Sequence, residues 1–382
     1  MPSFGRVVSL GGIFVTDPNG LEREHTYHGR PMTALTTSST LTPVRRTCWV
    51  RSPVWDVAMA LSWIPFSLAA IVFAGDVDHI AGLVAITLLF SVSHQPLTMP
   101  LVYADAHVYR SRPLIYSLTP PIIIALVLIG LQLDPVVIAV IAGVWNAGHT
   151  LQQRYGITRI YGRKVGQGDG TTEHRLLWTM LVLALTVAAV NPATPGRIAD
   201  SGLGGRNQKG LTVLTDAAPV ARVLLPFLIV FTAYLAVQWV RQELASEQVN
   251  PAKWFYLGSS AALIGLTIVS PIAGFVGYVG SHAAEYYLIV HNHLGDRYPD
   301  EVTDGGAPLG RAVRSRLGPF GLMAIYAVVV WGLILGLLNW GTYEVYAFTF
   351  LTLGAMHLFY DGLIWKLRRP EVARGFQITQ PD

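Results

Sequence analysis

The sequence predicts an all-α integral membrane protein, a helical bundle of about ten transmembrane helices. Its composition is the first reason, because 52% of the 382 residues are hydrophobic and only 13% are charged, about half the usual charged share. The second is a mean hydropathy of +0.44. The third is that apolar stretches long enough to cross ~30 Å of hydrocarbon follow one another from Trp55 onward.

The predicted spans begin and end within a few residues of these boundaries. They are 54–74, 80–104, 113–132, 135–156, 175–192, 217–240, 254–271, 273–293, 317–339 and 343–367. Only Ser270 to Gly274 separates the seventh span from the eighth. Proline can kink a membrane helix without ending it. Because the combined stretch is too long for one crossing, a tight hairpin is predicted at Pro271.

The chain is expected to be a multi-pass protein of the cell membrane. Its predicted organisation is a flexible N-terminal leader at 1–50, a polytopic transmembrane domain at 51–370 and a C-terminal tail at 371–382. Lys and Arg residues lie before the first span and after each even-numbered one, whereas the opposite loops hold only Arg197, Arg206 and Lys209. The positive-inside bias then places both termini in the cytoplasm.

Polar and ionisable side chains gather in the second, fourth, eighth and tenth spans. Even-numbered helices run in the same direction, and each carries its polar residues in its C-terminal half. These residues are therefore expected in one leaflet, near the cytoplasmic side. Ionisable groups inside a span are costly and usually functional. The candidate ligands are His94 in SVSHQPLT, His149 in WNAGHTLQQRYG, His282, Glu285, His291 and His293 in SHAAEYYLIVHNH, and His357 and Asp361 in MHLFYDGLIWK.

The spacing of these residues predicts a metal site. His282 and Glu285 are three residues apart and His357 and Asp361 are four apart, so each pair shares a helical face. Bundle-core di-iron sites use a His and a carboxylate one turn apart on inward-facing helices. Imidazole and carboxylate together suit Fe, Mn or Zn better than Ca or Mg. Residues expected to orient the ligands through hydrogen bonds are Asn146, Gln153, Tyr286 and Tyr360.

Other interpretations of the same residues stay open. A single intramembrane histidine can serve only as a hydrogen bond between helices. The His–carboxylate pairs can form ion pairs or a proton path, which would make the chain a proton- or metal-coupled transporter. Histidines on facing helices can also ligate haem. A purely structural subunit is the remaining alternative.

The net charge and the cysteine content limit which partners and cofactors the chain can be expected to have. The net charge of +4 is attributed to basic loops at the membrane surface. The expected partner is therefore the lipid bilayer, and no binding of nucleic acid is expected. Arg154 with Tyr155 and Trp365 with Lys366 are expected to be interfacial anchors. A basic cytoplasmic face would suit an acidic, ferredoxin-like electron donor. The single cysteine, Cys48, excludes an intrachain disulfide and a multi-thiolate iron–sulfur cluster.

With these clusters in a helical bundle, the chain resembles the membrane-bound non-haem di-iron oxygenases, which include fatty acid desaturases, alkane hydroxylases and sterol or carotenoid hydroxylases. The clusters SVSHQPLT, WNAGHTLQQRYG, HAAEYYLIVHNH and MHLFYDGLIWKLRRPEV carry the resemblance. Those families show HxxxH and HxxHH boxes, which this sequence lacks, so their ligand assignments are not transferred. The segment HLFYDGLIWKLRRPEV is also similar to the membrane enzymes of azoxy natural-product pathways, which act on N–N bonded hydrazines.

These observations lead to an expected function. The chain is expected to be an O2-dependent oxidase or oxygenase with two irons held by the candidate ligands, with an open coordination position in a dry cavity. Glu285 and Asp361 are the expected bridging, catalytic carboxylates, because each lies one turn from a histidine. The substrate would be a partly apolar small molecule or a lipid. The resemblance suggests hydroxylation or desaturation of a lipid, or oxidation of a hydrazine to an azoxy group.

Overall fold

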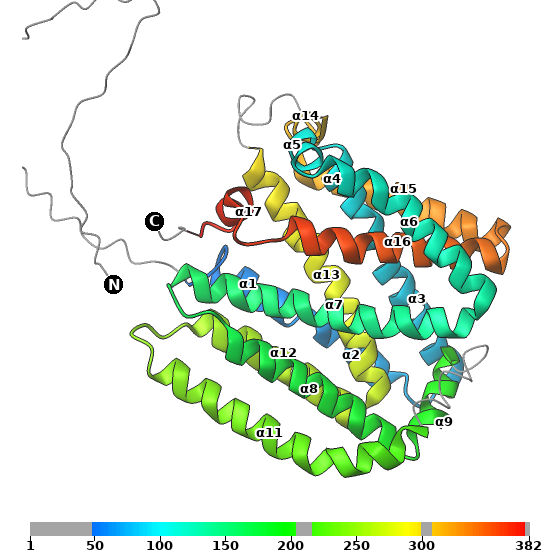
Figure 1. The fold of residues 1–382 in the computed structure, drawn as a ribbon, viewed down its shortest axis with the longest axis vertical. Helices are drawn as coiled ribbons and strands as arrows, with labels where there is room; N and C mark the ends of the chain where they lie inside the picture. The colour runs from blue at the N-terminus through cyan, green and yellow to red at the C-terminus, as the bar shows by residue number, and fades with distance from the viewer. Residues whose placement is uncertain (1–47, 204–215, 299–307, 379–382) are drawn as a thin grey trace, which may run out of the picture. The chain divides into compact units, whose positions relative to one another are not determined.

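The computed structural model describes residues 48–203, 216–298 and 308–378, and these residues form helices and connections with no β-strand. Most of the predicted leader and the last four residues of the tail lie outside this part of the chain. Figure 1 shows the arrangement. In chain order the elements are α1 (Pro53–Ala60), α2 (Trp63–Val72), α3 (Val77–His94), η1 (Gln95–Leu97), α4 (Thr98–Tyr103), α5 (Ala106–Ser111), α6 (Pro113–Leu133), α7 (Pro135–Lys164), α8 (Thr171–Val190), α9 (Thr194–Ile198), η2 (Ala199–Leu203), α11 (Ala218–Leu244), α12 (Pro251–Val269), α13 (Pro271–Arg297), α14 (Pro308–Val313), α15 (Gly318–Trp340), α16 (Tyr343–Ile364) and α17 (Pro370–Gly375).

Each of the ten predicted spans contains helix, with differences in detail. The first predicted span is interrupted between α1 and α2 at Leu61 and Ser62. The second is interrupted by η1, a short 3-10 helix that contains Pro96. α7 continues to Lys164, beyond the predicted boundary. Eight helices, counting α1 with α2 and α3 with α4 as one each, are long and apolar enough to cross a membrane. The long helices α7 and α13 are not among these eight, so the count of ten crossings stays a prediction.

The predicted hairpin between the seventh and eighth segments is confirmed. α12 ends at Val269, Ser270 has extended backbone angles, and α13 begins directly with Pro271. Proline suits the first position of a helix, because its missing N–H would have no partner there and its φ is already helical. α12 and α13 therefore pack against each other as neighbours.

α13 is the central helix of the bundle. Of its 27 residues, 18 are buried, and it packs against α2, α3 and α12 (Figure 1). The contact with α2 is close because Gly277 has no side chain where it meets Ser67, and small residues allow such approach between membrane helices. The Ser67 hydroxyl donates a hydrogen bond to the carbonyl of Ala273 at 2.8 Å. This packing fixes which face of α13 points to α3, α7 and α16.

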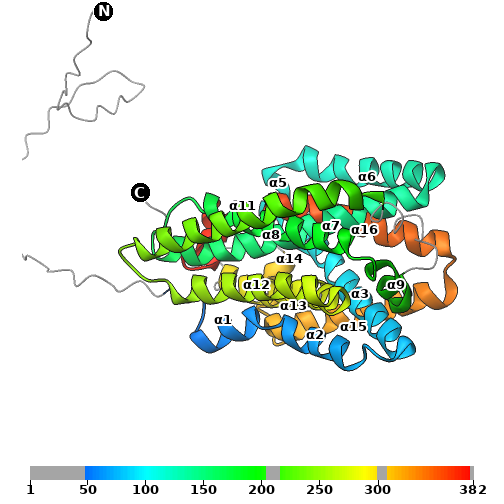
Figure 2. The same cartoon turned by 90° about the horizontal axis from the view of Figure 1, so that it is seen from below.

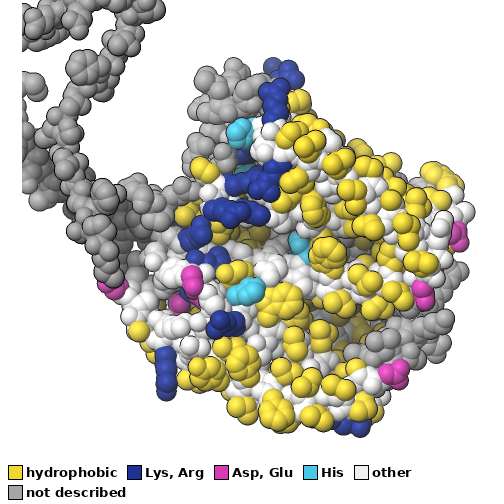
Figure 3. All heavy atoms as spheres, in the orientation of Figure 1, with side chains coloured by type: hydrophobic (Ala, Val, Ile, Leu, Met, Phe, Trp, Pro, Cys, Tyr) yellow, Lys and Arg dark blue, Asp and Glu magenta, His cyan; other side chains and the backbone are white. Residues whose placement is uncertain are grey.

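The outer helices show the opposite distribution. α6, α11 and α15 are strongly apolar, yet few of their side chains are buried inside the protein. Figure 2 shows α6 and α11 along one side of the bundle and α15 along the other. Apolar side chains on such an outer surface are typical of helices that contact lipid. Figure 3 shows this hydrophobic surface, with a band of Lys and Arg side chains over α5, α14 and the connection from α16 to α17.

The described part of the predicted C-terminal tail is packed against the bundle. α17 contacts α13, and Val372, Ala373, Phe376 and Ile378 are buried. The Lys164 ammonium group donates a hydrogen bond to the carbonyl of Phe376 at 3.3 Å. This end of the chain therefore closes the bundle where α7 and α16 end.

Candidate metal centre

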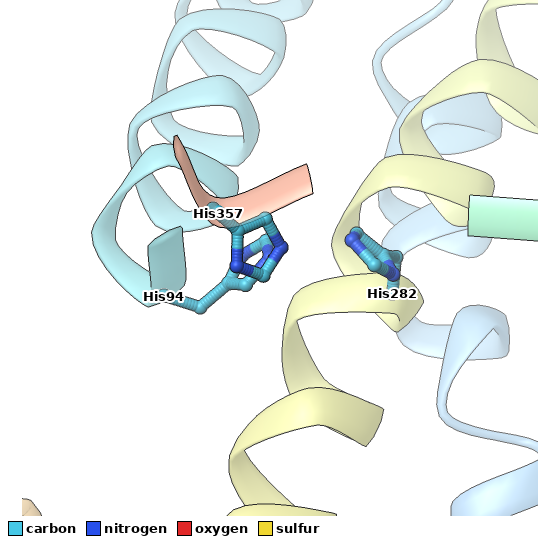
Figure 4. A group of neighbouring side chains, drawn as sticks. All are labelled: His94, His282 and His357. Atoms are coloured by element: carbon cyan, nitrogen blue, oxygen red, sulfur yellow. The ribbon is translucent and has the colours of Figure 1, made fainter. Parts of the chain in front are cut away.

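Four histidines from four helices meet inside the bundle. His94 ends α3, His149 lies in α7, His282 in α13 and His357 in α16. The Nε2 atoms of His94 and His357 are 3.2 Å apart. The ring centres of His94 and His282 are 4.7 Å apart, and His149 lies 5.1 Å from His282 and 5.0 Å from His357. Figure 4 shows the rings of His94, His282 and His357 facing one another.

With Asp361, these side chains form two sets of potential ligand atoms, and within each set all the atoms lie within 4.8 Å of one another. One set is His94, His282 and His357, and the other is His149, His357 and Asp361. Asp361 Oδ2 lies 3.6 Å from His357 Nε2 and 3.7 Å from His149 Nε2, too far for hydrogen bonds. His357 belongs to both sets. The five side chains therefore form one continuous group, which we call the His/Asp cluster.

The unpaired ring nitrogens of the cluster are suited to binding a cation. Buried polar atoms normally have partners, but within the described part of the chain both ring nitrogens of His282, Nδ1 of His94 and Nε2 of His149 have none. His94, His282 and His357 are completely buried. A metal ion would satisfy imidazole nitrogens that face one another, and a set of imidazole and carboxylate ligands suits a transition metal.

Thr98 orients the cluster, although the sequence did not single it out. Its Oγ1 lies 2.7 Å from His357 Nδ1 and 3.2 Å from Asp361 Oδ1. Thr98 follows His94 by four residues, on the other side of η1, at the start of α4. When the single hydroxyl proton goes to Asp361, Oγ1 accepts a hydrogen bond from His357 Nδ1–H. The Nε2 atom of His357 is then unprotonated and faces the cluster as a ligand.

Replacing Thr98 by Val is expected to weaken metal binding without unfolding the protein. Valine keeps the shape of the side chain but removes the hydroxyl that fixes the His357 ring. Loss of such an outer partner typically lowers metal affinity by about 10–100-fold. Metal competition with a chelator of known affinity measures the change. Thr98→Ser, which keeps the hydroxyl, should retain most of the affinity, and an unchanged affinity in Thr98→Val would contradict the role.

Asp361 presents one oxygen to the cluster. The Tyr286 hydroxyl donates to its Oδ1 at 2.9 Å, and Thr98 donates to the same atom. Only Oδ2 faces His149 and His357. Tyr286 also packs its ring 5.0 Å from His94 and 5.1 Å from His357. Oδ2 is therefore the Asp361 oxygen that a metal could share with His149 and His357, and Tyr286 is the hydrogen-bond partner of Oδ1. The bridging role of Asp361 stays a prediction.

Glu285 lies outside both sets of ligand atoms. Its Oε1 forms an ion pair with Arg154 at 3.1 Å, and its Oε2 accepts hydrogen bonds from Gln153 at 3.1 Å and Tyr256 at 3.0 Å. This position differs from the bridging role expected from sequence. Gln153 also donates to the carbonyl of His282 at 3.3 Å, so it links the pair to the cluster. The ion pair borders the cluster and does not join it.

Arg154 lies inside the bundle and not at the membrane interface. It is completely buried, so the expectation that it anchors the chain at the membrane interface is wrong. Its guanidinium group donates to Ser260 at 3.1 Å and Ser281 at 2.7 Å in addition to pairing with Glu285. The sequence could have indicated this burial, because Arg154 lies inside a predicted span next to Gln153, and an ionisable side chain inside a span needs a partner.

The other predicted residues lie away from the cluster. His291 and His293 follow His282 on α13 by nine and eleven residues, which at 1.5 Å per residue places them about 14 and 16 Å along the helix. His293 packs against Trp365, with ring centres 5.0 Å apart. The Tyr360 hydroxyl contacts the Tyr103 hydroxyl at 2.5 Å, outside the His/Asp cluster. Asn146 lies on α7 and is half-buried, outside both sets.

A cavity of about 560 Å³ adjoins the cluster. His149, Gln153, Tyr286 and Asp361 form a polar part of its wall, and most other lining residues are apolar or aromatic. Small-molecule sites in proteins are typically ~300–1,000 Å³, largely apolar, with a few placed polar groups. The cluster is therefore accessible from a space that a small molecule can occupy.

No protein-family model, no curated protein and no solved structure matches this chain. The resemblance to the di-iron oxygenases therefore stays a prediction from sequence. The structural evidence for a site is the geometry of the His/Asp cluster and its cavity.

Proposed function

We propose that this chain is an O2-dependent, non-haem iron oxidase or oxygenase of the membrane. The observation that carries the proposal is the opening of the His/Asp cluster into a largely apolar cavity through His149 and Asp361. A structural metal site is closed by its ligands, whereas a catalytic site keeps a position open to substrate. The substrate proposed is a partly apolar small molecule held in this cavity.

Each part of the site has a proposed role. His94, His149, His282, His357 and Asp361 would hold iron, and two ions are proposed. Because Nδ1 of His357 contacts Thr98, Nε2 is the ring nitrogen left for a metal, and it would bind one of the two ions. The bound irons would supply the redox chemistry that activates dioxygen. Thr98 and Tyr286 hold His357 and Asp361 in position, and the apolar wall excludes water. An acidic electron-transfer protein docking on the Lys/Arg band seen in Figure 3 is the proposed electron source.

The test is elemental analysis of protein purified in lipid nanodiscs, together with a visible spectrum. The expected result is close to two irons per chain and no Soret band, with oxygen uptake when a chemical reductant is added. A Soret band would show a cytochrome and contradict the proposal. Folded protein that binds no transition metal would contradict it as well.

A metal- or proton-coupled transporter is the second candidate. The observation that favours it is the buried Arg154–Glu285 pair beside the cluster, because charged pairs inside a membrane bundle often mark transport paths. Uptake of iron or protons into proteoliposomes distinguishes the two candidates. Transport that persists when dioxygen is excluded supports the transporter, and its absence from metal-loaded protein supports the enzyme.

A further inference from the structure

The cavity beside the cluster is a groove that follows one face of α7. Its lining includes Val144, Gly148, Gln152, Gly156 and Ile160, each four residues from the next. At 1.5 Å per residue this row extends about 24 Å along the helix. α16 supplies the facing wall, and Figure 1 shows α7 and α16 running in the same direction. The shape therefore suits a chain-like molecule lying parallel to the two helices.

One end of the groove opens at the apolar surface. Val144 is 69% exposed and Trp145 is 57% exposed, and both line the groove. Hydrophobic side chains cover this surface in Figure 3. Such a surface faces lipid in a membrane-spanning bundle. A molecule dissolved in the bilayer could therefore enter the groove sideways and reach His149.

The other end of the groove carries a positive charge. Ile160 packs there with the chain that follows α16, and Lys366 lines the groove directly after that helix. Burial and the neighbouring charges of Arg368, Arg112 and Arg369 lower the pKa of Lys366. Among the described residues, no carboxylate forms an ion pair with its ammonium group. An anion at this end would relieve the repulsion between these cations.

We propose that the groove binds a single-chain amphiphile with an anionic head. The head pairs with Lys366, and the apolar chain lies along α7 past His149 and Asp361. This inference rests on the proposed function, because it names the substrate class of the same cavity. Asp361 lies in the last turn of α16, which ends at Ile364, and Lys366 follows that end by two residues. The cluster is then beside the middle of the chain, so oxidation is expected at an internal position rather than at either end.

Binding can be measured on metal-free protein through its own tryptophans. Trp145, Trp178 and Trp365 line the cavity, so a brominated amphiphile bound there quenches their fluorescence. The probes are terminally brominated undecanoate, undecyl phosphate and undecanol. Phosphatidylcholine nanodiscs replace detergent, which would compete as an amphiphile. Saturable quenching is expected for both anions, each binding more tightly than the alcohol, and their order assigns the head to a carboxylate or a phosphate.

Variants of Lys366 test the assignment of the head. Lys366→Gln should weaken both anions by about tenfold or more, the effect of losing a charged hydrogen bond, and leave the alcohol unchanged. Lys366→Arg should retain the preference. Arg110→Gln removes an exposed cation outside the groove and controls for partitioning into the disc. Equal affinities for carboxylate and alcohol, or no effect of Lys366→Gln, would overturn the assignment.

A variant of Gly156 tests the position of the chain. A Cβ added at Gly156 meets no atom within 4 Å, so Gly156→Phe can fill the groove without a clash at the backbone. It should abolish saturable quenching by all three probes while iron binding persists. Quenching unchanged by Gly156→Phe would overturn the groove as the site. Because binding is measured without metal, these outcomes are distinct from the presence or absence of iron that decides the proposed function.

Discussion

His357→Ala is expected to abolish stoichiometric metal binding. His357 belongs to both sets of ligand atoms, so its loss removes a ligand whichever of the two sets holds the ion that its Nε2 binds. Its ring is completely buried, and its Nε2 lies 3.2 Å from His94 Nε2. Even loss of an outer hydrogen-bond partner typically lowers metal affinity by about 10–100-fold, and loss of a shared ligand should exceed that. Iron content per chain after gel filtration is the measurement.

His291→Ala is the matched control for this experiment. It removes the same side chain from α13, about 14 Å along the helix from His282, and should leave the iron content at the wild-type value. His282→Ala and His149→Ala each damage only one of the two sets. Loss of one iron of two in these variants would show two ions, whereas loss of all iron would show one. A fully loaded His357→Ala protein would contradict the assignment of the cluster.

Arg154→Met is expected to cause the largest loss of stability, about 3–5 kcal/mol in the free energy of unfolding. The substitution keeps an apolar chain in the space but leaves the Glu285 carboxylate buried without its counter-ion. Part of the stability should return in the double variant Arg154→Met/Glu285→Gln, which removes the buried negative charge and leaves an amide that Tyr256 and Gln153 can still contact. The measurement is unfolding of the metal-free protein in mixed micelles.

The control is Arg241→Met, at an exposed position near the end of α11, where removal of an arginine should change little. Equal stability of Arg154→Met and the wild type would mean that the Arg154–Glu285 pair does not form. A double variant that is no more stable than Arg154→Met would mean that the arginine acts through Ser260 and Ser281 rather than through the glutamate.

The sequence was informative where hydropathy and helical spacing are sufficient. Long apolar stretches locate the helices, because few other structures satisfy the backbone inside lipid. The grouping of His94, His149, His282 and His357 followed from their places in helices expected to run in the same direction. The rise of a helix could also have excluded His291 and His293, since they lie too far along α13 from His282.

Which neighbouring helix each side chain contacts could not be predicted from hydropathy and spacing. Glu285 shares a face with His282, but whether it meets the histidines or Arg154 depends on how α7 and α12 pack against α13. Thr98 looked ordinary in an apolar stretch, and its role arises only because α4 approaches α16. Single-sequence spacing fixes positions along and around one helix, whereas these contacts depend on the relative rotation of several.

The burial of α13 has a consequence for how the protein enters the membrane. The helix that contributes His282 and Glu285 is enclosed by its neighbours, and it is not among the helices apolar enough to cross alone. Charged and polar residues at the centre of a segment oppose its release from the translocon into lipid. The short turn at Ser270 and Pro271 ties α13 to the more apolar α12, so the two are expected to insert as one hairpin. The side chains of the cluster then meet only after α16, synthesised later, has reached its place.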